Sequence, residues 1–267
     1  MNIAIFGYSG FIGSHLVKLI SKDHKLLKIN ARNISNKLSK EQIFGYLEKT
    51  LVNPDIIINC CANTNPKTNN DIFINENLSK LIQEYILHKG LNSHFFHFSS
   101  INVLIESRMD KYTISKINAE RRLIKNFTSI IRLPLIINFD EGKKGDLDIF
   151  YKYLNLRIFP FYPMIYPGNI YRPIEIKNFC NFFSEIIKID NKKDIYNLMG
   201  KETKNMWELF EIIAKKHNKK IFKIKTKIIN KILPKFIKEN FFKKNSFLGQ
   251  FLSIDQSFIN EKDITII

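Results

Sequence analysis

The chain has 267 residues, and its 42 Lys and Arg against 25 Asp and Glu give a formal net charge of +17. With 45% hydrophobic and 25% charged residues it is ordinary for a globular protein, which excludes a disordered, collagenous or coiled-coil chain. Three cysteines, two of them adjacent at Cys60 and Cys61, exclude a disulfide framework and favour a reducing compartment.

Short apolar runs alternate with longer helical patterns over the first 135 residues. Strands are expected over 2–6, 26–30, 55–59, 94–98 and 129–133. Helices are expected over 11–22, 40–50, 71–88 and 109–126. Because the strand runs are apolar throughout and alternate strictly with helices, they predict a parallel sheet covered on both faces, with right-handed crossovers.

The pattern changes near residue 138. A stretch rich in Pro and aromatic residues is followed by an expected helix over 176–188, a strand over 194–198, a helix over 204–216 and a very basic, partly helical end. The sequence therefore predicts an α/β, Rossmann-type doubly wound parallel sheet over 1–137 that binds a dinucleotide. Residues 138–267 are expected to form mainly a smaller, substrate-binding lobe, with segments around 170–200 returning to the main sheet.

A glycine-rich loop follows the first expected strand and opens the first expected helix. Gly7 permits a tight turn off the strand, Gly10 leaves room for a pyrophosphate beside the backbone, and Gly13 allows close packing of the helix on the sheet. The first turn, with Phe11 and Ile12, offers free N–H groups to phosphates. This strand–turn–helix context predicts a dinucleotide site; a structural turn without a ligand is the alternative.

The end of the second strand bears on the choice of cofactor. An acidic residue there holds the ribose 2′-hydroxyl of NAD and repels a 2′-phosphate. Here the segment contains Asn30 and Arg32 and no acid, so both residues are candidate cofactor contacts and NADP is favoured slightly over NAD. A solvated Arg32 with no ligand is the alternative.

Tyr-x-x-x-Lys occurs twice, as Tyr85 with Lys89 and as Tyr112 with Lys116. Tyr85 lies late in an expected helix on its inward face, which indicates core packing. Tyr112 and Lys116 lie at the start of the next helix, one turn apart, so they share a face. A phenol has a pKa of about 10, and a neighbouring ammonium group lowers it toward the range useful for acid–base catalysis.

Several motifs now stand in a fixed order. They are the glycine loop, Asn59-Cys60-Cys61-Ala62, Phe98-Ser99-Ser100, Tyr112-Thr113-Ile114-Ser115-Lys116 and Ile131-Arg132-Leu133-Pro134. With them the chain resembles extended short-chain dehydrogenase/reductases of the NAD-dependent epimerase/dehydratase family. The resemblance implies that Tyr112 is the acid/base of a hydride transfer, that Lys116 also holds the nicotinamide ribose, and that Ser100 hydrogen-bonds the reacting oxygen.

The same resemblance implies further contacts. Cys60, Cys61 and Ala62 would line the cofactor, with the cysteines as packing residues and not metal ligands. The substrate would contact four residues, Thr64, Ser99, Asn138 and Arg172, of which Arg172 suits a diphosphate through its planar fork of donors.

Two features select among the family's reactions. Ile101 and Asn102 follow Ser100 where 4,6-dehydratases carry an acidic pair, and the stretch 53–64 is similar to that of dTDP-4-dehydrorhamnose reductases. We therefore expect NAD(P)-dependent reduction of a nucleotide-linked keto-sugar. The alternatives are a nucleotide-sugar C4 epimerase with tightly bound NAD, and a non-catalytic NAD(P)-binding sensor or assembly protein.

Charge and hydropathy indicate the surroundings of the protein. The positive charge is spread along the chain and favours anionic small molecules, while basic stretches lack the motifs of nucleic-acid binding. No uncharged run is long and clean enough to span a bilayer, and the N-terminus has no targeting pattern. We expect a cytoplasmic protein that binds no nucleic acid. The oligomeric state is open: the resemblance implies that a homodimer through the helices near 71–88 and 109–126 is one possibility, since relatives often dimerise there.

Overall fold

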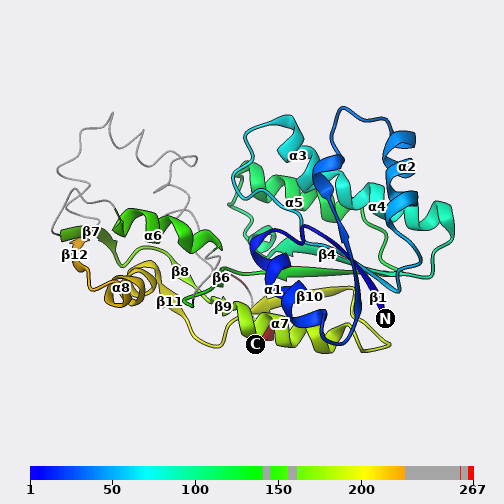
Figure 1. The fold of residues 1–267 in the computed structure, drawn as a ribbon. Coiled ribbons are helices and arrows are strands. Elements are labelled where there is room, and N and C mark those ends of the chain that lie inside the picture. Colours follow the sequence, from blue (N-terminus) through cyan, green and yellow to red (C-terminus); the bar gives the residue numbers. More distant parts are fainter. Residues whose placement is uncertain (141–144, 156–160, 226–258, 260–263) are drawn as a thin grey trace.

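The computed structural model describes residues 1–140, 145–155, 161–225, 259 and 264–267. Among them runs a seven-stranded parallel sheet in the order β13-β10-β5-β4-β3-β1-β2 (Figure 1). Its strands are β1 (Asn2–Phe6), β2 (Lys25–Ile29), β3 (Ile56–Asn59), β4 (His94–Ser100), β5 (Thr128–Leu133), β10 (Ile195–Met199) and β13 (Ile264–Ile266). The predicted α/β fold class is confirmed.

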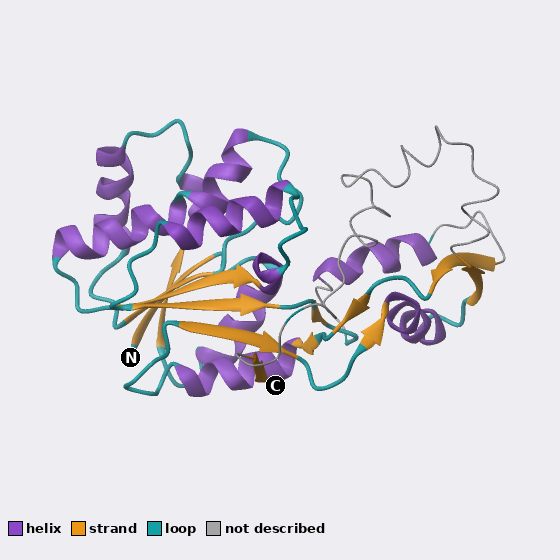
Figure 2. Cartoon of the chain, turned by 180° about the vertical axis from the view of Figure 1, so that it is seen from behind, coloured by secondary structure: helices purple, strands orange, loops and turns teal. Residues whose placement is uncertain are grey.

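Helices cover both faces of this sheet (Figures 1 and 2). One face packs against α1 (Phe11–Ile20) and α7 (Ile176–Ile186). The other packs against α2 (Lys40–Thr50), α3 (Asn69–Glu76), α4 (Leu78–Lys89) and α5 (Lys111–Arg121). Alternate residues of each strand enter the two cores: Ile3 and Ile5 face α1 and α7, whereas Ala4 and Phe6 face α2 and α4.

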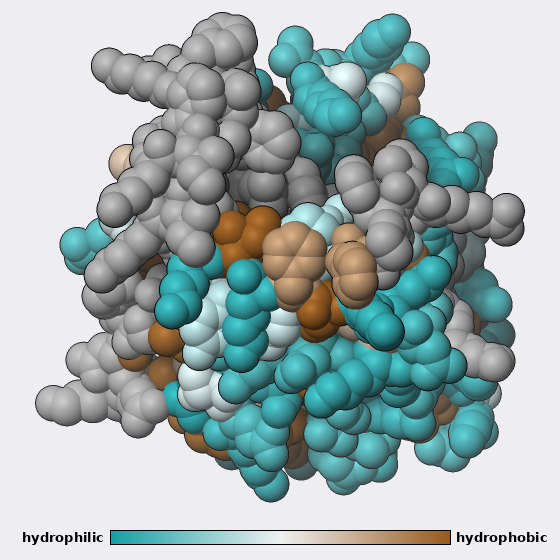
Figure 3. Space-filling model, turned by 90° about the vertical axis from the view of Figure 1, so that its left-hand side faces the viewer, coloured by the Kyte–Doolittle hydropathy of each residue, from teal (hydrophilic) through white to brown (hydrophobic). Residues whose placement is uncertain are grey.

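The remaining elements form a smaller lobe beside the carboxyl ends of the strands (Figure 2). It contains β6 (Ile136–Ile137), η3 (Gly145–Leu147), α6 (Asp148–Leu154), β7 (Phe161–Tyr166), β8 (Ile170–Tyr171), β9 (Ile174–Glu175), β11 (Lys204–Asn205), α8 (Met206–Lys216) and β12 (Lys220–Lys225). Its own core centres on Phe150, Tyr162, Trp207 and Phe210. The described surface at the outer end of the lobe is largely hydrophilic, with a few hydrophobic side chains at its centre (Figure 3).

One sequence-based expectation about helices was wrong. The single helix predicted over 71–88 is two helices, α3 and α4, which meet at Asn77. Arg122 donates to the Asn77 side chain and pairs with Glu76 at 2.6 Å, so contacts with the end of α5 hold the chain where its direction changes. In the basic end, residues 220–225 form the strand β12, and most of the later residues lie outside the described part.

The polypeptide after α7 returns to the main sheet. β10 pairs with β5, placing Tyr196 opposite Ile131, and β13 pairs with β10 from nearly seventy residues further along the chain. Among the described residues, no helix is both long and apolar enough to cross a membrane.

Candidate functional site

The candidate site lies where the order of the strands reverses. The chain passes from β1 to β2 on one side and places β3 on the other side of β1. In such sheets a crevice opens at the carboxyl ends of the strands on either side of the reversal, and ligands bind there. The glycine loop follows β1 and the Cys60–Ala62 segment follows β3, so both line this crevice.

The glycine loop is shaped by close backbone contacts. Gly7 has φ +78°, and a Cβ there would lie 2.9 Å from the Cys60 carbonyl carbon. At Gly13 a Cβ would lie 2.1 Å from the Gly7 carbonyl oxygen, so α1 packs directly on the turn. Gly10 precedes α1, and a Cβ on it would lie 3.2 Å from the same oxygen. The three glycines therefore form a cradle of bare backbone.

The N-terminus of α1 faces this cradle. Gly10 supplies no side-chain cap, and the first turn carries no acidic residue. Its free N–H groups and the helix dipole therefore favour an anion. Gly145 of the smaller lobe lies against the Phe11 ring, since a Cβ there would be 2.5 Å from it. The lobe thus reaches the start of α1.

The segment after β3 is fixed to its surroundings by hydrogen bonds. The Cys60 thiol donates to the Phe6 carbonyl at 2.9 Å, and burial raises the pKa of Cys61 to about 12. Asn75 accepts from the Asn63 N–H at 2.8 Å and donates to Ser115 at 3.2 Å, so it joins this segment to α5. No cluster of metal-ligating residues occurs in the described ranges.

The residues at the end of β2 are accessible. Asn30 and Arg32 are both exposed, and Ala62 is exposed on the far side of the crevice. The Asn30 side chain accepts from the Arg32 N–H at 3.2 Å and begins the short helix η1 (Ala31–Asn33). This leaves the Arg32 guanidinium available to a ligand at the carboxyl end of β2.

β4 and α5 carry the predicted catalytic residues. Lys116 is only 1% exposed, and its ammonium donates to the Phe98 carbonyl at 2.8 Å. Burial lowers its pKa to about 8, opposed by the neighbouring Cys61, Glu120 and Cys60. Ser100 ends β4 and its hydroxyl accepts from the Asn102 N–H at 3.3 Å, beginning η2 (Ile101–Leu104).

Tyr112 is the second residue of α5 and is half-buried. Its position is set by the start of the helix, where the Asp110 carboxylate accepts from the Thr113 N–H at 3.0 Å. Arg108 pairs with Asp110 at 2.5 Å and also donates to the Thr113 hydroxyl at 3.0 Å. Sequence reasoning missed Arg108 and Asp110, although an Asp directly before a helix is a common cap.

The four predicted substrate contacts lie in different surroundings. Ser99 is buried, Thr64 is exposed, and Asn138 is buried with its side chain accepting from the Asp140 N–H at 3.0 Å. Arg172 is half-buried and donates from Nε to the Gly200 carbonyl at 3.1 Å. Asn138 follows β6 and Arg172 lies between β8 and β9, so both belong to the smaller lobe.

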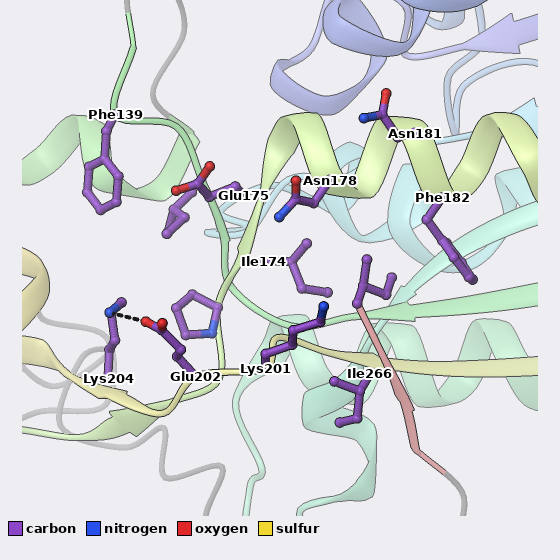
Figure 4. Close-up of a pocket in the computed structure, with 13 residues that line it drawn as sticks. Phe139, Ile174, Glu175, Asn178, Asn181, Phe182, Lys201, Glu202, Lys204 and Ile266 are labelled. Atoms are coloured by element: carbon purple, nitrogen blue, oxygen red, sulfur yellow. Dashed lines mark hydrogen bonds and ion pairs between the residues drawn. The ribbon is translucent and has the colours of Figure 1, made fainter.

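A separate surface cavity of about 610 Å³ lies between the first half of α7, the segment 201–204 and the last residues of the chain (Figure 4). It contains none of the predicted catalytic or cofactor-binding residues. Lys204 at its rim is paired with Glu202 at 2.6 Å. The candidate site is therefore the crevice at the strand ends and not this cavity.

Comparison with known proteins gives likenesses in structure alone. No protein-family model and no curated protein matches the sequence. The structure is similar to a dTDP-4-dehydrorhamnose reductase from Yersinia enterocolitica, with a TM-score of 0.69 and 17% identity over 85% of each chain. A dTDP-4-dehydrorhamnose reductase from Bacillus anthracis in complex with NADP gives 0.68 and 15% over 84% of each chain.

A third similar structure is that of an enzyme with a different activity. The UDP-glucose 4-epimerase from Thermus thermophilus in complex with NAD has a TM-score of 0.62 and 15% identity, over 84% of this chain and 86% of the epimerase. The seven-stranded sheet and the smaller lobe together are therefore the fold that these reductases and this epimerase share.

Proposed function

We propose that this protein is an NAD(P)-dependent reductase of the extended short-chain dehydrogenase/reductase family, acting on a nucleotide-linked keto-sugar. The observation that carries the proposal is the placement of Lys116. Its ammonium is buried against the end of β4, and Lys116 follows Tyr112 by one helical turn. The glycine loop lies in the same region of the sheet, where the strand order reverses. Similar structures include reductases of this substrate class.

The cradle fits a dinucleotide. Gly7, Gly10 and Gly13 leave no side chain between the backbone and a pyrophosphate, and α1 directs uncapped N–H groups at it. Phe11 and Ile12 supply those N–H groups, and Cys60, Cys61 and Ala62 flank the opposite side. When bound, the reduced nicotinamide supplies a hydride.

The choice between NADP and NAD depends on the end of β2. One similar structure holds NADP and another holds NAD, so the fold is compatible with both. Arg32 is exposed there, and no acidic side chain stands at this strand end. A cation favours a 2′-phosphate, so we favour NADP.

The side chains of this protein supply the acid–base part of the reduction. The Tyr112 hydroxyl donates a proton to the carbonyl oxygen while hydride adds to the carbonyl carbon, giving an alcohol and a phenolate that solvent then protonates. The Lys116 ammonium stabilises that phenolate. Ser100 donates a hydrogen bond that holds the carbonyl oxygen.

We further propose the binding partners of the chain. Arg172 and Asn138 on the smaller lobe would contact the substrate, with Thr64 and Ser99 on the sheet side. A nucleotide-sugar substrate and a nicotinamide cofactor would agree with a cytoplasmic protein, and we propose that location. A homodimer through α3, α4 and α5 is one possible state, and the sedimentation coefficient would test it.

The experiment compares the two Tyr-x-x-x-Lys pairs of the same chain. With dTDP-4-dehydrorhamnose and NADPH, the unmodified protein should oxidise NADPH, and Tyr112→Phe should lower kcat by about 100-fold or more. Tyr85→Phe is the matched control because Tyr85 is buried against Phe44 in the helix layer. Equal effects of the two substitutions, or no NADPH oxidation by the unmodified protein, would contradict the proposal.

A further inference from the structure

A directed chain of buried hydrogen bonds runs from the cofactor crevice into β4. The Cys61 N–H donates to Asn59 Oδ1 at 3.0 Å, which fixes the orientation of that amide. Asn59 Nδ2 therefore donates to the Ser79 hydroxyl at 2.8 Å. The Ser79 hydroxyl oxygen lies 2.7 Å from His97 Nδ1, and among the described residues this nitrogen is the only acceptor in reach of the Ser79 hydrogen, so Ser79 donates to it. His97 accordingly carries its proton on Nε2.

The Nε2–H of His97 is a buried donor that needs an acceptor. His97 is 0% exposed, and its Nε2 has no hydrogen-bond partner in the part of the chain that the structure describes. The hydroxyl of Ser99, which is 4% exposed, likewise has no hydrogen-bond partner among the described residues. Buried polar groups of this kind are usually satisfied by an ordered water molecule.

Both groups lie on the side of β4 that Lys116 approaches. His97 and Ser99 are two residues apart on β4, so their side chains leave the same face of the sheet, and the bond from His97 to Ser79 identifies it as the face under α4 and α5. Lys116 reaches β4 from α5 and binds the carbonyl of the residue between them, Phe98. A water molecule there can accept from Nε2–H and from the ammonium, and donate to the Ser99 hydroxyl.

We propose that His97 is a positioning residue for Lys116, acting through one buried water molecule that His97 Nε2–H, the Lys116 ammonium and the Ser99 hydroxyl hold in common. This role rests on the proposed function, because it fixes the ammonium that supports Tyr112. The water gives the buried ammonium an acceptor in addition to the Phe98 carbonyl, and so stabilises its charged form.

The charge distribution around Lys116 agrees with this arrangement. Burial and then the charge of Lys116 hold the pKa of His97 well below its usual value, so His97 stays neutral. The other titratable groups acting on Lys116 are Cys60 and Cys61 after β3 and Glu120 on α5, all of which favour its charged form. Losing the water would lower the pKa of Lys116 further.

Two substitutions separate the two nitrogens of the imidazole. His97→Asn keeps a polar group near the Nδ1 position for Ser79 but removes Nε2–H. His97→Gln places an amide N–H near the Nε2 position and loses the Ser79 contact. In a pH profile of kcat/KM, His97→Asn should move the alkaline limb about one pH unit lower, the size expected for one hydrogen bond to a charged group. His97→Gln should restore the limb of the unmodified protein.

Crystal structures of the unmodified protein and of His97→Asn supply a readout that does not depend on turnover. The water should lie within hydrogen-bonding distance of Nε2 and of Lys116 Nζ, and should be lost in the variant. Loss of activity in His97→Gln with a normal profile in His97→Asn would overturn the proposal in favour of a structural role through Ser79. Absence of the water would overturn it too. An unmodified protein that shows the water but binds no NADPH would instead refute the proposed function.

Discussion

At the scale of single residues, the buried Lys116 ammonium lowers the stability of the fold, although the proposed function requires it. The unfolded chain binds a proton at Lys116 up to its ordinary pKa of 10.5, whereas the folded chain loses it near pH 8 because of burial. Below pH 8 Lys116 is charged in both the folded and the unfolded chain, and burial of this charge lowers the free energy of unfolding. As the pH rises from about 8 to 10.5, the folded chain loses the proton first and this destabilisation disappears. The ammonium is therefore maintained at a cost to stability.

Lys116→Met should make this cost measurable. Methionine fills a similar volume without a charge, so at pH 7 the variant should gain about 2 kcal/mol in free energy of unfolding by urea, and lose reductase activity. The gain should shrink between pH 8 and 10 as the native lysine loses its proton. A variant less stable than the unmodified protein at pH 7 would show that the bond to Phe98 outweighs the cost of burial.

At the scale of elements, the contact between α1 and the loop after β1 requires glycine. A methyl group at Gly13 would lie 2.1 Å from the Gly7 carbonyl oxygen, and backbone cannot move aside cheaply. Gly13→Ala should therefore destabilise the fold by about 2 kcal/mol or more and abolish NADPH binding. In contrast, a Cβ at Gly45 in the middle of α2 meets nothing within 4 Å.

Gly45→Ala is thus the matched control. Alanine is the better helix former, so this variant should be stabilised by about 0.5 kcal/mol in urea unfolding and bind NADPH normally. Opposite signs for the two substitutions would show that the Gly13 effect comes from the helix–loop contact. Normal NADPH binding by Gly13→Ala would contradict the cradle.

The same scale shows how far sequence alone could go. The run 2–6 predicted β1 with its observed bounds, because a buried parallel strand is apolar throughout. The break at Asn77 depends on Arg122 from another helix, and β13 pairs with a strand distant in sequence, so neither has a local pattern. His97 carries no motif either; its role emerges when the fold brings Ser79 and Lys116 to it.

At the scale of the whole molecule, the main sheet with its helices and the smaller lobe meet at the start of α1. The sheet supplies the cradle and the Tyr112–Lys116 turn, and the smaller lobe supplies Gly145 against Phe11 and Arg172 beside the end of β10. A reductase and an epimerase share this architecture. What separates them is whether the cofactor leaves in each cycle.

A reductase must release its oxidised cofactor after every turnover, whereas a C4 epimerase regenerates it and must retain it. We therefore expect the purified protein, whose formal net charge is +17, to carry little nicotinamide nucleotide. Mass spectrometry after denaturation would show this. It should then bind NADPH more tightly than NADH in a fluorescence titration, because the exposed Arg32 follows β2, where a 2′-phosphate would lie. Stoichiometric NAD released on denaturation would establish the epimerase alternative. A protein that turns over no keto-sugar yet binds NADPH would be a sensor or assembly subunit. A protein that is purified without nucleotide and binds neither NADPH nor NADH would contradict the assignment of the glycine loop as a dinucleotide site.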